Sequence, residues 1–141
     1  MVQPSAPQRT EVVRLIESRF GVHPQHPWAR TPDYAVFRHP PQQRWFAVLM
    51  PELPGRVIGH PAGERVDLLN LKADPRMIGS LIDHRHFFPA YHMNKEHWYS
   101  VWLDGSLGAD TLLPLLEISH RLTAPSLPKS PKSQNPANAD L

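Results

Sequence analysis

The sequence predicts one α+β domain, in which an antiparallel sheet of about four to five strands carries helices on one face. Two observations support this class. Helix-like and strand-like segments follow one another in the order helix, three strands, helix, strand, helix. Most of the expected strands are separated by short connections rich in proline, and such connections favour antiparallel neighbours. A length of 141 residues suits one domain. We expect residues 9–124 to form it, after a flexible N-terminus at residues 1–8.

The first helix is expected at residues 10–20. Thr10 can cap it, and Gly21 suits its exit. Its apolar residues recur with a spacing of four: Val12, Ile16 and Phe20. This spacing places them on one side of a helix, which would pack on the sheet.

The next part of the chain reads as strands and loops. Strands are expected at 34–38, 45–50 and 65–71, where apolar residues are dense. Residues 51–63 contain a Pro-Gly turn and read as a loop, with a short strand near 56–58.

The second helix is expected at 74–82, because Asp74 can cap it and Pro75 loses no hydrogen bond at its first position. Residues 84–95 read as a long irregular connection to a strand at 98–103. A last helix begins near 110 or 111 and runs to about 123, with a proline tolerated in its first turn.

Composition excludes several classes of protein. Without cysteine there is no disulfide, thiolate metal site or cysteine nucleophile. No run approaches the roughly 20 apolar residues that span a bilayer, and the N-terminus lacks a signal-like apolar segment, so we expect a cytoplasmic protein. Residues 1–58 carry seven Arg and Lys against four Asp and Glu, whereas residues 59–124 carry six against eight. The second half is therefore slightly acidic, and charge alone does not indicate DNA binding.

Two segments in that acidic half carry a resemblance. The matching residues are Leu71, Lys72, Asp74, Pro75, Tyr91, His92, Met93, Asn94, Lys95 and Trp98. With these residues the chain resembles the MmcQ/YjbR family, whose members are usually described as predicted DNA-binding proteins. The weaker similarity extends over about residues 9–122. The resemblance implies a frataxin-like (CyaY-like) or secretion-chaperone-like α+β fold, in agreement with the pattern of elements. It also implies binding of double-stranded DNA without catalysis.

The DNA-binding hypothesis assigns a role to six side chains. Lys72, Arg76 and Lys95 would contact phosphates, while His92, Asn94 and Trp98 would position a wing-like turn. A structural explanation stays open for the turn, because asparagine favours turns through its own local hydrogen bonds. It also stays open for Arg76, because Asp74 supplies a competing negative charge.

The alternative function is a protein-interaction or homodimerisation module. Trp98 and Trp102 share one face of their strand, and Tyr99 begins the set on the other face. If the Tyr99 set packs on the helices, the two tryptophans lie on the open face of the sheet, where exposed aromatic residues indicate an interface. Otherwise the tryptophans belong to the core.

We expect no cofactor, no metal and no enzymatic activity. The sequence has no nucleophile elbow, phosphate-binding glycine loop or zinc-binding helix motif. A third hypothesis is a small-molecule or metal site around His84, His86 and His92. Residues 125–141 are rich in Pro, Ser, Lys and Asn and are expected to form a disordered tail, whose Pro-x-x-Pro spacing also matches polyproline ligands.

Overall fold

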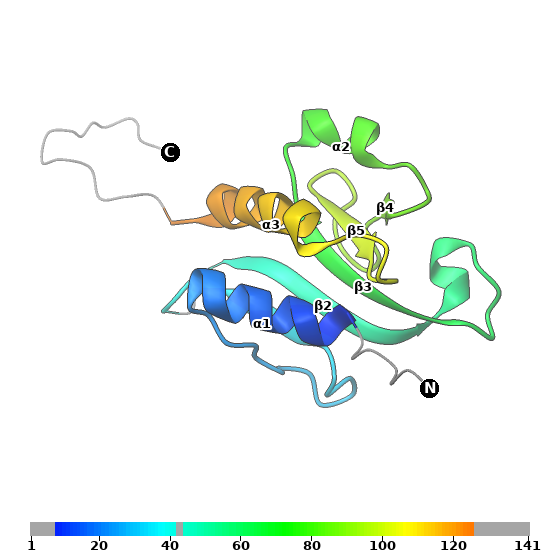
Figure 1. Cartoon of the computed structure of the whole chain (residues 1–141), viewed down its shortest axis with the longest axis horizontal. Coiled ribbons are helices and arrows are strands. Elements are labelled where there is room, and N and C mark those ends of the chain that lie inside the picture. Colours follow the sequence, from blue (N-terminus) through cyan, green and yellow to red (C-terminus); the bar gives the residue numbers. More distant parts are fainter. Residues whose placement is uncertain (1–7, 42–43, 126–141) are drawn as a thin grey trace, which may run out of the picture.

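The computed structural model describes residues 8–41 and 44–125 and confirms the α+β class. Its elements are α1 (Gln8–Phe20), β1 (Ala35–Arg38), β2 (Trp45–Pro54), the 3₁₀ helix η1 (Gly55–Ile58), β3 (Arg65–Lys72), α2 (Pro75–Leu81), β4 (Phe87–Pro89), β5 (Trp98–Trp102) and α3 (Ala109–Thr123) (Figure 1). The predictions for residues 1–7 and 126–141 lie outside the described residues. No helix in the described part of the chain has the length and apolar character needed to cross a membrane.

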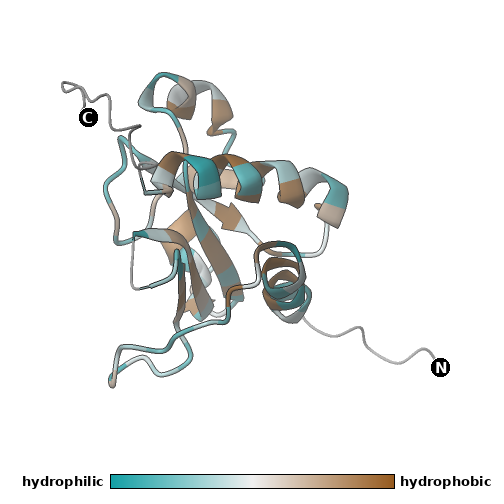
Figure 2. Cartoon of the chain, turned by 90° about the vertical axis from the view of Figure 1, so that its left-hand side faces the viewer, coloured by the Kyte–Doolittle hydropathy of each residue, from teal (hydrophilic) through white to brown (hydrophobic). Residues whose placement is uncertain are grey.

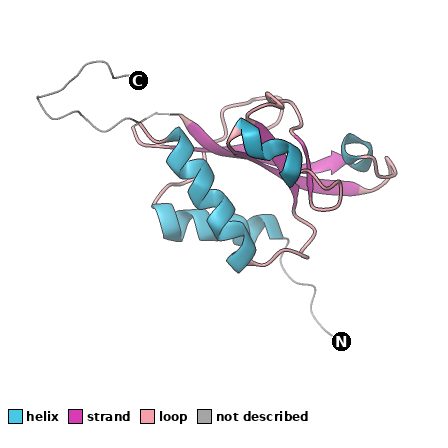
Figure 3. Ribbon diagram, turned by 90° about the horizontal axis from the view of Figure 1, so that it is seen from above, coloured by secondary structure: helices cyan, strands magenta, loops and turns pink. Residues whose placement is uncertain are grey.

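The five strands form one antiparallel sheet in the order β1-β2-β3-β5-β4. Figure 3 shows α1 and α3 together on one side of this sheet. The main core lies between them and the strands, and it includes Ile16 of α1, Leu116 of α3 and Tyr99 of β5. Figure 2 shows hydrophobic residues concentrated on the strands and helices and hydrophilic residues along much of the outer loops. The helices therefore cover one face, as the spacing of apolar residues predicted.

The opposite face of the sheet carries a second apolar cluster instead of being open. Val48, Met50 and Leu68 are buried there, and loop residues such as Trp28 and Met93 pack against them. Because Tyr99 faces the helices, the tryptophans of β5 lie on this second face. Trp98 and Trp102 are both half-buried, and the ring of Trp102 lies 4.6 Å from that of His60. Loops thus cover much of the face on which the interface alternative depends.

Four elements differ from the predicted ones. α1 begins at Gln8 rather than at residue 10, so Thr10 lies within the helix and does not cap it. β2 continues to Pro54 rather than ending at residue 50, because a register shift between Met50 and Leu53 accommodates the proline at 51. The expected strand at 56–58 is wrong, since η1 occupies these residues. The irregular connection contains the short strand β4. Its start is fixed by Asp83, whose Oδ1 accepts the backbone N–H groups of residues 85, 86 and 87.

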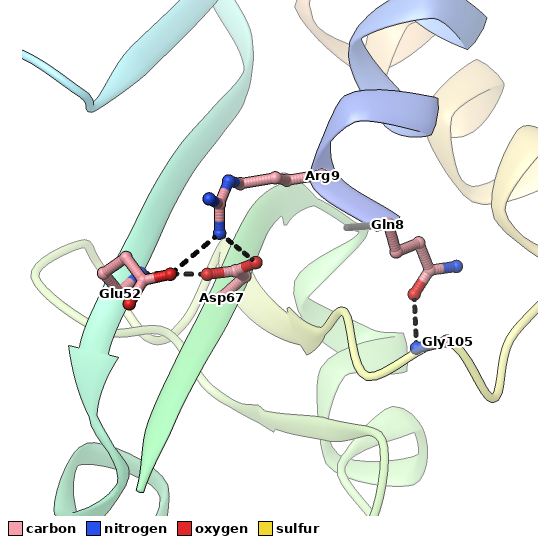
Figure 4. Close-up of polar contacts among 5 residues, drawn as sticks. All are labelled: Gln8, Arg9, Glu52, Asp67 and Gly105. Carbon is pink, nitrogen blue, oxygen red and sulfur yellow. Dashed lines mark hydrogen bonds and ion pairs between the residues drawn. The ribbon is translucent and has the colours of Figure 1, made fainter. Parts of the chain in front are cut away.

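The irregularity in β2 is held by a polar cluster that also fixes the start of α1 (Figure 4). Glu52 has a left-handed backbone with φ of 60°, and its N–H donates to Asp67 Oδ1 at 2.9 Å. Arg9 Nη1 donates to Asp67 Oδ2 at 2.8 Å and to Glu52 Oε2 at 3.1 Å. Gln8 adds a bond from the N–H of Gly105 to its Oε1 at 2.8 Å. These contacts join α1 to β2, β3 and the loop after β5.

Candidate nucleic-acid interface

The two segments that carry the family resemblance lie side by side in the structure. Lys72 at the end of β3 is the register partner of Trp98 at the start of β5. The N–H of Ala73 donates to the carbonyl oxygen of His97 at 3.0 Å. The corner between β3 and α2 therefore meets the end of the connecting turn, which we define as residues 91–97.

A buried polar network fixes the beginning of the connecting turn. Asn70 and Ser100 are register partners in the middle of the sheet, and both are 0% exposed. The Ser100 hydroxyl donates to Asn70 Oδ1 at 2.5 Å and accepts the N–H of Tyr91 at 3.0 Å. Asn70 Nδ2 donates to the carbonyl oxygen of Tyr91 at 2.9 Å. Both polar backbone groups of Tyr91 thus have partners inside the sheet, which holds the turn in one position.

Sequence reasoning missed Asn70 and Ser100 as positioning residues. Each interrupts an apolar strand, in the runs Leu68-Leu69-Asn70-Leu71 and Tyr99-Ser100-Val101. A polar side chain within such a run is unfavourable unless it has a partner. This signal identifies buried residues that need partners, although it does not show which ones they contact.

Lys72 and Trp98 border a cavity that we call the basic hollow. It has a volume of about 400 Å³ and is lined by Arg44, Trp45, Lys72, Met93, Trp98 and Thr123. Two cationic side chains and two indole rings therefore share one depression. Within residues 8–41 and 44–125, neither Arg44 nor Lys72 has a carboxylate partner within 4.0 Å. Their charges are available to an anionic ligand.

Arg76 is engaged differently from the other predicted phosphate contacts. Its Nη2 lies 2.8 Å from Asp74 Oδ2, and its backbone N–H donates to Asp74 Oδ1 at 2.9 Å. These hydrogen bonds from Arg76 lower the pKa of Asp74 to about 2, so the carboxylate stays charged. Asp74 caps α2 as predicted, and its carboxylate also forms an ion pair with the Arg76 guanidinium. The structure therefore supports the structural explanation of Arg76.

The remaining predicted residues lie in the connecting turn. Asn94 Oδ1 accepts the N–H of Glu96 at 2.7 Å, and the Asn94 carbonyl accepts the N–H of Trp98 at 3.0 Å. Asn94 therefore forms the turn through local bonds. Lys95 is exposed, and so is His92, whose ring lies 3.9 Å from that of Tyr91. Of the six predicted residues, the structure brings Lys72 and Trp98 together in the hollow and places Lys95 in the neighbouring turn.

Comparison with known proteins matches the same part of the chain. The model of the family described as YjbR matches residues 18–122, which include α2, β5 and the connecting turn. The chain belongs to the YjbR family. The uncharacterized protein YyaQ of Bacillus subtilis (strain 168) is 32% identical over 115 residues, which cover 82% of this chain and 97% of YyaQ. The predicted family membership is confirmed.

Solved structures of similar proteins share the fold of this YjbR-family chain. A crystal structure of a Pseudomonas syringae protein is 43% identical, with a TM-score of 0.77, and the match covers 82% of this chain and 98% of that one. A solution NMR structure of a protein from the same organism is also 43% identical, with a TM-score of 0.72 over 82% and 92% of the two chains. A Deinococcus radiodurans protein with the domain name DUF419 is 24% identical, with a TM-score of 0.59 over 81% and 76%, and shows similarity of fold alone.

The histidines do not form a metal site in the part of the YjbR domain that is described. No three side chains of metal-binding type gather there. His86 lies 3.9 Å from Asp83, while the ring of His84 faces Phe88 and that of His92 faces Tyr91. Each of the three histidines suggested by the sequence thus has a different neighbour. A metal centre has no support in this geometry.

A different pair of histidines, His39 and His120, meets at the C-terminal end of α3, where His39 is buried and His120 is half-buried. The ring centroids of His39 and His120 are 4.1 Å apart, and His39 Nε2 lies 3.0 Å from the Thr123 hydroxyl. Burial lowers the pKa of both rings. The pair packs on Phe46, and Thr123, the hydrogen-bond partner of His39, also lines the basic hollow.

Proposed function

We propose that this YjbR-family protein binds nucleic acid without catalysis, with the basic hollow as the contact for the phosphate backbone. The observation that carries the proposal is the hollow itself, in which Arg44 and Lys72 lie beside Trp45 and Trp98. Arginine and lysine supply the donors that phosphates accept. Aromatic rings beside them add contacts to sugars and bases. Lys95 is exposed in the connecting turn, two residues after Met93 of the hollow, and is a further cation for this contact.

The proposal keeps the residue types predicted from the sequence but changes the set. Arg44 takes the place of Arg76, whose guanidinium is paired with Asp74. Asn94 and Asp74 support the backbone rather than contact the ligand. The resulting contact set is Arg44, Lys72 and Lys95, with Trp98 beside them.

Fluorescence anisotropy with a labelled duplex of about 25 base pairs tests the proposal at low and near-physiological salt. The triple variant Arg44→Ala, Lys72→Ala, Lys95→Ala should bind more weakly at every salt concentration. Its log–log salt slope should be smaller by up to about 0.9 for each phosphate that the variant no longer neutralises.

A control variant separates these contacts from the overall charge. Arg14, Arg56 and Arg65 are exposed residues outside the basic hollow, and replacing all three by alanine removes the same charge. The control should retain the wild-type salt slope. Equal binding by the two triple variants would reject the basic hollow as the contact.

The alternative, a homodimer formed through the aromatic face, rests on Trp98 and Trp102. It is favoured by their place on the face away from α1 and α3, and it is weakened by the packing of Trp102 on His60. Trp98 would then be the anchor. Light scattering over a range of protein concentrations should show a mass that doubles in the wild type and stays monomeric in Trp98→Ala. A constant monomeric mass in the wild type would reject the dimer.

A further inference from the structure

A second cavity on the same face, which we call the aromatic pocket, adjoins the basic hollow. It has a volume of about 400 Å³ and is lined by Trp28, Thr31, Tyr34, Trp45, Val48, Met50, His92 and Met93. Small-ligand pockets commonly have volumes of roughly 300–1,000 Å³. The ring of Trp28 lies at 86° to that of Trp45, with centroids 5.6 Å apart, and at 78° to that of Tyr34, 6.2 Å away. Flat aromatic walls thus meet at nearly right angles above buried Val48 and Met50.

Polar groups at this pocket are available to a ligand. The lining residues include Thr31, Tyr34 and His92, whose side chains carry two hydroxyls and an imidazole. None of these three groups has a hydrogen-bond partner among the described side chains and backbone groups. The pocket therefore offers flat apolar surfaces together with a few donors and acceptors, the combination that recognises a planar heteroaromatic ring.

The wall made by the connecting turn is held in place by the rest of the fold. His92 has a left-handed backbone with φ of 63°, a conformation that is uncommon for residues other than glycine, although histidine adopts it more often than most. It follows Tyr91 directly, and Asn70 and Ser100 bind both backbone groups of Tyr91. The buried network thus fixes His92 and Met93 at the pocket in this uncommon conformation. Residues held in such conformations concentrate at binding sites.

The two cavities share walls, since Trp45 and Met93 line both. One cavity presents Arg44 and Lys72, and the other presents aromatic rings. A ligand that carries an anionic group next to a planar ring matches both at once. We infer that the aromatic pocket takes an unpaired base of a single-stranded nucleic acid while the adjoining phosphate lies in the basic hollow. This inference rests on the proposed function and specifies its ligand, because a closed duplex keeps its bases stacked and out of the pocket.

The test compares three labelled ligands by anisotropy at one low salt concentration: a single strand, its duplex, and a strand of equal length with abasic sites in place of the bases. The wild type should bind the normal strand most tightly. One base stacked on aromatic rings should strengthen binding about 5- to 150-fold over the abasic strand. The Trp28→Ala variant should lose this preference and bind the abasic strand as the wild type does.

A second variant guards against misfolding of the first. Glycine accepts a positive φ without strain, so His92→Gly removes the imidazole and keeps the course of the turn. It should reduce binding of the normal strand but not of the abasic strand. Equal wild-type affinity for the normal and abasic strands would overturn the inference, and so would an undiminished preference in both variants.

The outcomes separate this inference from the proposed function. If all three ligands bind alike, and if binding depends on Arg44 and Lys72 but not on Trp28, the function stands and the base pocket is rejected. If no polymer binds at low salt, both are rejected. A final experiment titrates the protein with a mononucleotide such as AMP and measures binding by tryptophan fluorescence. Saturable binding of AMP without any preference for the normal strand would assign the pocket to a free nucleotide and overturn the inference.

Discussion

Replacing Ser100 by alanine tests whether the buried network determines the position of the connecting turn. The change removes a hydroxyl that donates to Asn70 Oδ1 and accepts the N–H of Tyr91. Asn70 Oδ1 and the N–H of Tyr91 are then without partners in or beside the core. Each such group costs about 1–3 kcal/mol when it is left unpaired. The free energy of unfolding should therefore fall by about 2–6 kcal/mol, a large share of the roughly 5–15 kcal/mol typical of a domain.

Urea unfolding followed by tryptophan fluorescence measures this loss as a lower midpoint at an unchanged slope. Ser106→Ala is the matched control, because the Ser106 hydroxyl also donates to a side chain, Asp104 Oδ1 at 2.6 Å, but does so in an exposed loop. The control should change the free energy of unfolding by less than about 0.5 kcal/mol. A Ser100→Ala loss no larger than that of the control would refute the role assigned to the network.

The double variant Asn70→Leu, Ser100→Ala measures how much the hydrogen bond between these two side chains contributes to stability. When both polar side chains are removed, neither the Asn70 amide nor the Ser100 hydroxyl is left in the core without its partner. The double variant should therefore lose less free energy of unfolding than the sum of the two single losses. Strict additivity would mean that the hydrogen bond between the two side chains contributes little.

Three further predictions concern stability. Burial lowers the pKa of His39 and His120 below their ordinary value of 6.5. The contribution of the two neutral rings to the free energy of unfolding should therefore be complete above pH 6.5 and should decline as the pH falls through the lowered values. A urea midpoint that does not decrease when the pH is lowered from 7.5 to 5 would contradict this. Ile16→Ala should cost about 2–5 kcal/mol, since Ile16 is 0% exposed, whereas Met77→Ala, at a residue 54% exposed, should cost much less in the same assay. Asp67→Ala should cost roughly 1–3 kcal/mol by releasing the strand irregularity and the start of α1, and hydrogen exchange should then rise first at these two places.

Most of the fold could be predicted because its signals are local. The spacing of Val12, Ile16 and Phe20 defines α1, and Asp74 with Pro75 defines the start of α2. β4 could not be predicted in the same way. It has three residues, ends in a proline and exists because β5 pairs with it. A segment so short has no alternation to read, and its register partners are ten to fourteen residues away along the chain.

In the candidate site, too, some residues could be predicted from the sequence and others could not. Lys72 and Trp98 were identified from the sequence, and their adjacency follows from the β3–β5 register. Arg44 and Trp45 were missed as site residues, because they reach the hollow only through the antiparallel pairing of β2 with β3. Residue type suggested that an aromatic and basic surface was present. The register of the sheet decides which residues make it.

The outer strands of the sheet have a consequence for aggregation. On the free side of β1, Gln25 and Val36 exchange both backbone hydrogen bonds at 2.9 Å, so a loop of the same chain already uses the groups that another strand would need. At the opposite border, β4 is three residues long and ends with Pro89, which has no N–H to donate. Such borders hinder the addition of a strand from a second molecule. We therefore expect concentrated solutions of the folded protein to resist the growth of β-rich fibrils.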